Sequence, residues 1–204
     1  MSNIMNHNGA AMLAMMGKEC VTIGSDLTFN TGMQHQGRVF KVFPVTDKIL
    51  LGLTGLFSDC QTFYQNVMYE VKLLQLKEGR EIQPQHFGVL VAHMLYEKRF
   101  GPYFIEPLIA GLDEDNKPYI ANTDTIGCLT EPDDFLVCGT AAEKILGPAE
   151  SFWEEDLEAE ELFEATAQAL LAGIDRDSSS GWGSVVYTLT PQKMVTRFLR
   201  NRQD

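Results

Sequence analysis

Long apolar runs are missing from this sequence, and basic residues are scarce. No apolar run reaches the ~18 residues that a membrane-spanning helix needs. The first residues also lack the basic and then apolar pattern of a secretion signal. Among the 204 residues, 28 are acidic and 16 are basic, which gives a formal net charge of −12. A negative surface repels phosphate backbones, so we expect no nucleic acid among the partners. The lack of a long apolar run predicts that the chain does not span a membrane, and we expect no membrane partner.

Paired cysteine motifs are missing as well. The four cysteines show no CxxC spacing, and they are Cys20, Cys60, Cys128 and Cys138. This arrangement predicts reduced, buried thiols and argues against a disulfide framework or a metal cluster. The histidines likewise lack the spacing of metal ligands. Because no linker, repeat or low-complexity segment divides the chain, we expect a single domain over residues 1–204.

The sequence does contain alternating strand-like and helix-like segments. Strand-like runs separated by turn residues predict hairpins, which pair residues 10–16 with 20–24, 38–43 with 49–54, 104–112 with 119–123, and 183–190 with 193–199. Residues 134–138 predict one more short strand. The segment 44–48 is expected to be the turn of the second hairpin.

Helix signals fall between these strands. Apolar residues at three- and four-residue steps predict a long helix that Ser58 and Asp59 cap and Gly79 ends, and Pro84 opens a second helix. Thr140 with Glu143 has the spacing of a capping box, and Asp156 is the expected cap of a helix that reaches Ile174, its last apolar residue. This order of elements limits the fold class to an α+β or layered αβ domain.

The segment between Gly9 and Lys41 carries a family resemblance. Gly9 is followed by small residues and Leu-Ala, then by Val-x-Ile-Gly-Ser-Asp ending at Asp26, by Gly32, and by Val-x-Lys-Val around Lys41. This order resembles the opening of a 20S proteasome beta subunit, a member of the N-terminal-nucleophile hydrolase superfamily. The resemblance covers essentially the whole chain, and residues 76–84, 95–113 and 133–140 resemble the non-catalytic beta-3 type. It implies an α+β fold, the four-layer αββα sandwich of that superfamily.

One position separates this chain from the active members of the family. In those members a threonine follows the glycine, and self-cleavage frees it as the nucleophile. Here Ala10 follows Gly9, whereas such an enzyme needs a hydroxyl or thiol beside a free α-amine. The resemblance therefore implies a subunit that is not an enzyme and keeps its first residues attached. Two alternatives stay open, namely an amidohydrolase with an atypical nucleophile such as Cys20 and an independent binding module on the same fold.

The resemblance also implies partners and a cellular setting. The chain would assemble with other proteasome alpha and beta subunits into a hetero-oligomeric particle of four rings. It would help to shape a neighbouring proteolytic site in ubiquitin- and ATP-dependent protein degradation. The expected location is the cytoplasm and the nucleus. No cofactor is required for this role.

Remnants of an active site can be assigned by the same resemblance. Around Ala10 they are Asp26, Lys41, Gly55, Asp177 and Ser180. Asp26 and Lys41 match the pair that tunes the nucleophile, but a structural ion pair is the favoured interpretation, because breaking a buried pair costs ~3–5 kcal/mol. Gly55 matches an oxyanion donor, and a required turn is the favoured interpretation. The family's serine-rich turn is degraded at residues 139–142.

Two further sites are implied. Asp124 matches a position that lines the substrate pocket of a neighbouring subunit, and the alternative is a turn residue. The backbone carbonyls of Ile174, Asp177 and Ser180 match a cation-binding loop, to which the C-terminal Asp204 of another subunit would add a carboxylate. Hard oxygen ligands of this kind fit a structural magnesium or calcium ion. The alternative for Asp204 is a solvated terminal residue.

Overall fold

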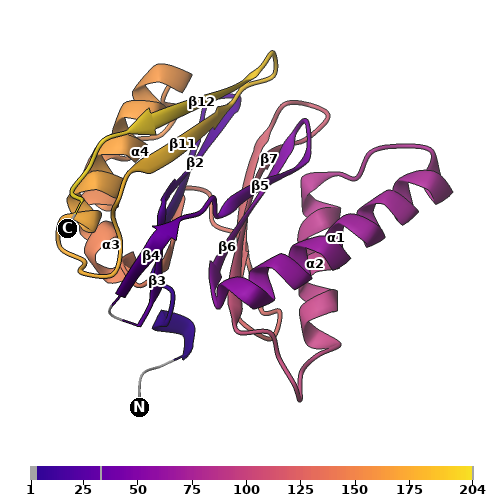
Figure 1. Ribbon diagram of the computed structural model, residues 1–204. Coiled ribbons are helices and arrows are strands. Elements are labelled where there is room, and N and C mark those ends of the chain that lie inside the picture. Colours follow the sequence, from indigo (N-terminus) through magenta and orange to yellow (C-terminus); the bar gives the residue numbers. More distant parts are fainter. Residues whose placement is uncertain (1–3, 33, 204) are drawn as a thin grey trace.

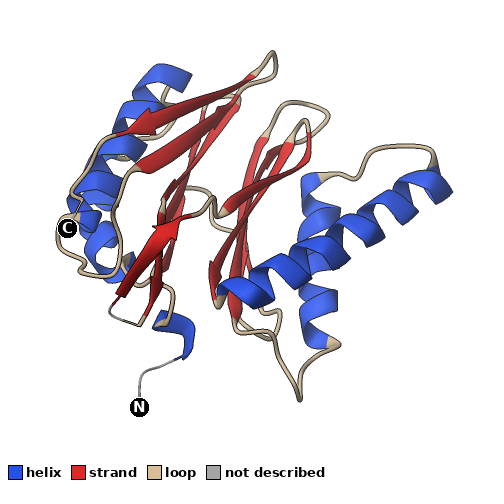
Figure 2. Cartoon of the chain, viewed as in Figure 1, coloured by secondary structure: helices blue, strands red, loops and turns tan. Residues whose placement is uncertain are grey.

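The computed structural model describes residues 4–32 and 34–203, and it has four layers (Figures 1 and 2). Two five-stranded sheets pack face to face, and a pair of helices covers the outer face of each. This arrangement confirms the expected αββα sandwich. No helix in the described part of the chain has the length and apolar character needed to cross a membrane.

The first sheet is antiparallel throughout. Its strand order is β10 (Phe135–Gly139), β1 (Ala11–Gly17), β2 (Cys20–Asp26), β11 (Ser184–Leu189) and β12 (Met194–Leu199). Helices α3 (Ala142–Phe152) and α4 (Ala159–Ile174) cover its outer face. Because β1 lies between this helix layer and the second sheet, both of its faces are buried, which explains its uninterrupted apolar sequence.

The second sheet has its own pair of helices. Its strand order is β5 (Val42–Thr46), β6 (Ile49–Gly55), β7 (Ile105–Leu112), β8 (Pro118–Thr123) and β9 (Leu129–Thr130). Helices α1 (Phe57–Glu78) and α2 (Pro84–Tyr96) cover it. A separate hairpin of β3 (Thr28–Thr31) and β4 (Gln34–Arg38) and a short 3-10 helix (Ile4–Asn6) lie near the N-terminus (Figure 1).

Apolar side chains from both sheets meet in the middle of the sandwich. Met12 on β1 and Ile23 on β2 face Leu50 on β6 and Leu108 on β7, and all four are at most 1 % exposed. The sheets approach closely here, since a Cβ at Gly52 would lie 2.2 Å from the Met12 sulfur. A glycine at this place on β6 therefore leaves the room that Met12 fills.

Two strand predictions need correction. Residues 28–31 and 34–38 form the β3–β4 hairpin, which the sequence did not predict because these residues are mostly polar. The strand expected over residues 38–43 begins only at Val42, and the expected turn at 44–48 is partly strand, because Pro44 and Thr46 belong to β5. Proline is tolerated there because β5 is an edge strand with a local irregularity.

The predicted N-terminal caps of α1, α3 and α4 are also wrong, whereas Gly79 ends α1 as predicted and the helices themselves are confirmed. Asp59 lies inside α1, and its carboxylate accepts a hydrogen bond from the Phe104 N–H at 2.9 Å. No capping hydrogen bond from Thr140 is present, because the N-cap of α3 is Ala141. At α4 the N-cap is Glu158, whose N–H donates to Glu161 at 3.3 Å, and not Asp156.

Candidate functional site

Ala10 lies directly before β1 and is 3 % exposed. A cavity of only about 10 Å³ lies beside it, and its lining includes Ala10, Lys41 and Gly55. A volume of this size holds about one water molecule. The structure therefore brings these three predicted residues together around one small hollow.

The predicted Asp26–Lys41 pair is present at the end of β2. The Lys41 ammonium donates to the Asp26 carboxylate at 2.6 Å, to the Thr28 carbonyl at 2.7 Å and to the Asp26 carbonyl at 3.4 Å. Asp26 in turn accepts backbone N–H groups of Ala11 at 2.9 Å and Gly181 at 3.3 Å. Since Lys41 is 4 % and Asp26 0 % exposed, this is a buried ion pair with every ammonium proton engaged.

A second polar cluster lies on the other side of Ala10. The Thr140 hydroxyl accepts from the Ala10 N–H at 3.2 Å and donates to Asp177 at 2.8 Å. Lys144 on α3 donates to the same carboxylate at 2.7 Å, and Ser179 donates to it at 3.2 Å. Burial alone would raise the pKa of Asp177, but the hydrogen bonds from Lys144 and Thr140 outweigh it and hold that pKa below its usual range.

Asn8 and Gly9, directly before Ala10, are part of the fold. Asn8 is 6 % exposed, and its side chain donates to the Asn30 carbonyl on β3 at 2.7 Å. Its side-chain oxygen accepts from the Phe57 N–H, the first of α1, at 2.9 Å. Gly9 follows with φ +67° and contacts Ser179 so closely that a Cβ would lie 2.1 Å from the Ser179 carbonyl oxygen. Asn8 therefore caps α1 from a distant part of the sequence.

Gly55 ends β6 with φ +110°. A Cβ at this position would lie 2.3 Å from the carbonyl oxygen of Phe104. Only glycine fits such a conformation and approach. The geometry thus accounts for Gly55 as a required turn without any catalytic role.

The loop expected to bind a cation already holds an arginine. Arg202 donates to the backbone carbonyls of Asp175, at 3.0 Å, and of Asp177, one of the expected ligands. The Ile174 carbonyl accepts from the Asp177 N–H at 3.1 Å. A guanidinium repels a second cation, so the loop as it stands does not fit magnesium or calcium. An ion here stays a prediction, and Asp204 lies outside the described residues.

Comparison with known proteins identifies the family of this chain. A family model described as "Proteasome subunit" matches residues 6–189. This chain belongs to the proteasome subunit family. A protein named "Proteasome subunit beta type-3" from Picea mariana is 47% identical over 203 residues, which cover 99% of this chain and 100% of that protein. A "Probable proteasome subunit beta type-3" from Schizosaccharomyces pombe is 48% identical and a "Proteasome subunit beta type-3" from Caenorhabditis elegans 45% identical, with the same coverage.

Several residues of this proteasome-family site were not found from the sequence. Lys144 and Ser179 complete the Asp177 cluster, and Asn8 closes the site on the N-terminal side. Residues 139–142 were interpreted as a degraded turn, yet Thr140 makes the contacts to Ala10 and Asp177. The predicted Ser180 is 2 % exposed and lies next to the serine that donates to Asp177.

Asp124 of this proteasome-family chain lies in the turn between β8 and β9. Its carboxylate accepts the backbone N–H groups of Ile126 at 3.0 Å and Cys128 at 2.8 Å. These contacts agree with the interpretation of Asp124 as a turn residue. The carboxylate is nevertheless exposed, so it is open to a neighbouring molecule.

Cys20, the residue named as an atypical nucleophile, lies away from Ala10 along the sheet. Cys20 is the first residue of β2 and Asp26 is the last, so the two lie at opposite ends of the strand. Burial raises the pKa of the Cys20 thiol to about 11. A thiol with this pKa stays protonated near neutral pH and is a poor nucleophile. Cys60 and Cys138 are buried as expected, whereas Cys128 is exposed, so the prediction of four buried thiols is wrong at that position.

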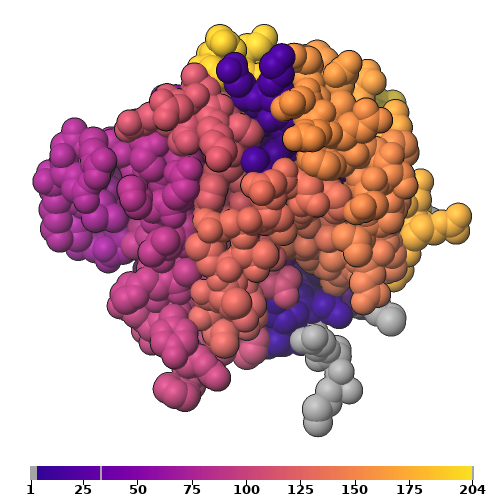
Figure 3. Space-filling model, turned by 180° about the vertical axis from the view of Figure 1, so that it is seen from behind, coloured from indigo at the N-terminus to yellow at the C-terminus, as the bar shows by residue number. Residues whose placement is uncertain are grey.

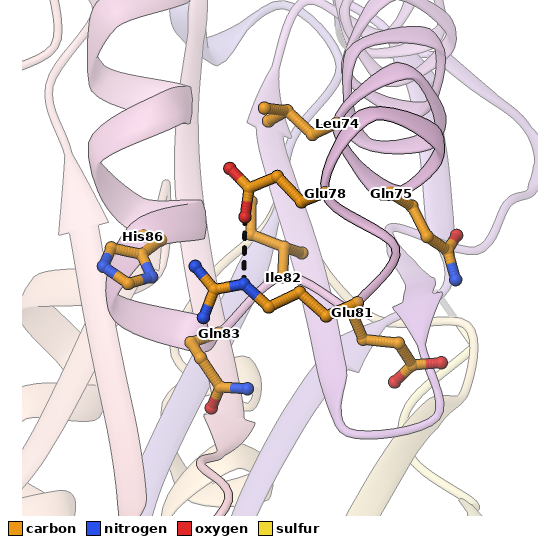
Figure 4. Close-up of a pocket in the computed structure, with 8 residues that line it drawn as sticks. Leu74, Gln75, Glu78, Glu81, Ile82, Gln83 and His86 are labelled. Carbon is orange, nitrogen blue, oxygen red and sulfur yellow. Dashed lines mark hydrogen bonds and ion pairs between the residues drawn. The ribbon is translucent and has the colours of Figure 1, made fainter.

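A larger hollow, of about 230 Å³, lies between the end of α1 and the start of α2 (Figure 4). Glu78, paired with Arg80 at 3.0 Å, and His86 lie on its wall. Because α1 has 22 residues, roughly 30 Å separate this hollow from Asn8 at the other end of the helix. The described residues contain no group of three or more His, Cys, Asp or Glu that could hold a metal. The hollow is therefore separate from the site around Ala10.

Proposed function

We propose that this chain is a structural beta-type subunit of the 20S proteasome core without peptidase activity of its own. The observation that carries the proposal is Ala10, a methyl group at the position where a family member that cuts peptides needs a hydroxyl. The Lys41 contacts agree with it, because the ammonium is bound by the Asp26 carboxylate and the Asp26 and Thr28 carbonyls, as in a structural ion pair. The chain would occupy a place in the beta ring through side-to-side contacts with other alpha and beta subunits.

The test combines native mass measurement with intact mass measurement. A tagged chain isolated from cells should be found in a particle of many subunits, and its mass should include residues 1–9. The purified chain alone should not cleave fluorogenic peptides or bind an epoxyketone covalently. A stable monomer in cell extract would argue against a ring subunit. A terminus trimmed at Gly9, or an epoxyketone adduct, would argue for an active amidohydrolase.

Asp124 is proposed to line the substrate pocket of a neighbouring subunit. Its carboxylate is held by two backbone N–H groups and exposed, which suits a fixed charge presented across an interface. Asp124→Asn keeps an acceptor for the turn and removes the charge. Particles that contain this variant should cleave peptides with basic and with neutral side chains in a changed ratio. An unchanged ratio would leave Asp124 with its turn role alone. We also expect the chain in both cytoplasm and nucleus, which imaging of a tagged copy checks.

A further inference from the structure

Exposed aromatic side chains lie in and beside the turn that follows α2. Phe100 is 98 % exposed, Tyr96 63 % and Phe104 38 %. The turn projects from the body of the molecule below the second sheet in Figure 1, and it forms the pink projection at the lower edge of Figure 3. We call residues 96–104 the aromatic turn. Single exposed apolar residues are common on protein surfaces, but an almost fully exposed phenylalanine with two more exposed aromatics in the same short segment suits a contact.

Hydrogen bonds fix the shape of the aromatic turn. The Lys98 N–H donates to the Leu95 carbonyl at 3.0 Å, and the Gly101 N–H donates to the Lys98 carbonyl at 2.9 Å. On the far side, the Phe104 N–H donates to Asp59 on α1 at 2.9 Å. A turn that is already ordered loses little conformational entropy when it binds. Phe100 is therefore presented as a preorganised anchor.

The charge of the aromatic turn differs from that of the rest of the chain. Lys98 and Arg99 are adjacent at its tip, in a chain whose formal net charge is −12. The Arg99 guanidinium lies over the Phe100 ring, 5.5 Å from its centroid. Residues 96–104 contain one acid, Glu97, whose carboxylate lies 3.3 Å from the His93 ring nitrogen, so this segment is net positive in an acidic chain. The tip thus combines an apolar ring with two positive charges.

From these contacts we propose that the aromatic turn docks into a neighbouring subunit of the particle, with Phe100 filling an apolar pocket whose rim carries carboxylates. Buried aromatic anchors supply much of the binding free energy of protein interfaces. Opposite charges around such an anchor favour the correct partner and register. This inference rests on the proposed function, because it assigns one of the contacts by which the chain is held in the particle.

The test uses the full chain in cells that contain its partner subunits. Wild-type and Phe100→Ala chains with different tags are expressed together, and their ratio in the assembled particle is compared with their ratio in the total pool. We expect the variant to be depleted at least about tenfold, as for an interface hot spot. Phe100→Leu, which stays apolar, should be depleted less. Lys98→Glu with Arg99→Glu should be depleted, and Lys98→Arg with Arg99→Lys should not.

Two further measurements separate docking from other causes. Because Phe100 is 98 % exposed, Phe100→Ala should leave the melting temperature of the isolated chain unchanged, and a lowered temperature would overturn the docking explanation. A photo-crosslinking residue at position 100 should capture an apolar side chain near Asp or Glu on another subunit. Equal incorporation of Phe100→Ala, or a crosslink to a second copy of this chain or to a basic surface, would overturn the inference. Absence of the wild-type chain from the particle would instead contradict the proposed function.

Discussion

Two clusters of paired polar and charged side chains flank Ala10. Lys41 contacts Asp26, and Thr140 with Lys144 contacts Asp177. Each of these charged groups is paired inside the protein. Changes at these residues should therefore affect stability.

Lys41→Met should destabilise the chain strongly. It leaves the fully buried Asp26 carboxylate without its ion-pair partner, which costs about 3–5 kcal/mol of unfolding free energy. Chemical denaturation of the purified chain measures this loss. The control is Lys41→Met combined with Asp26→Asn, which removes both charges and should recover part of the loss. An equal loss in the single and the double variant would contradict a structural ion pair.

The Asp26–Lys41 contact was predictable because two charges at the ends of apolar strands need each other when buried. The roles of Lys144 and Ser179 were not, since they reach Asp177 only after α3 and the loop before β11 have packed together. Sequence spacing carries no information about such contacts. That Ala10 stands at the position of the family's nucleophile, in contrast, is predicted from the sequence motif alone.

Helix α1 shows how an element depends on distant parts of the chain. Its N-cap residue, Leu56, makes no side-chain capping bond, and Asn8 supplies the acceptor for the Phe57 N–H instead. The helix itself was predictable from its apolar spacing and from Gly79, which ends it at φ +70°. Its N-terminal cap was not predictable. Ser58 and Asp59 have the residue types of a cap, but the acceptor comes from Asn8, which is far from α1 in the sequence.

Asn8→Ala should lower the unfolding free energy by about 1 kcal/mol, the usual cost of losing a helix cap. The lost bond to the Asn30 carbonyl acts in the same direction. Thermal and chemical denaturation measure the change. Asn6→Ala is the matched control, because Asn6 is exposed and two residues away, so its loss should stay within about 0.5 kcal/mol. Equal effects of the two variants would refute the cap.

The loop between α4 and β11 should not depend on a metal ion. Arg202 binds its carbonyls, so a chelator should leave the melting temperature of the wild-type chain unchanged. Arg202→Met should lower the unfolding free energy by about 2 kcal/mol, the order of a hydrogen bond from a charged group. Arg200→Met removes an exposed arginine nearby and should have little effect. A chelator that lowers the melting temperature would instead support the magnesium or calcium prediction.

Both sheets contribute to one buried layer, which ties the molecule together. Met12 is fully buried in this layer between the sheets. Met12→Ala should lower the unfolding free energy by about 2–5 kcal/mol, because it leaves a cavity at the centre. Met194→Ala, on a residue that is 44 % exposed, is the control and should have little effect. Coincident loss of helix and aromatic signals would support one domain over residues 1–204, whereas two separate transitions would contradict it.

The position of β12 has a consequence for cells that make too much of this chain. Within the described residues, β12 closes the first sheet on one side, and Met194 and Phe198 on it are exposed. An outermost strand with unpaired backbone groups is a template for adding strands from other molecules. Copies synthesised in excess of their partners would therefore tend to aggregate through this edge. Rapid degradation of such orphan copies would prevent this aggregation.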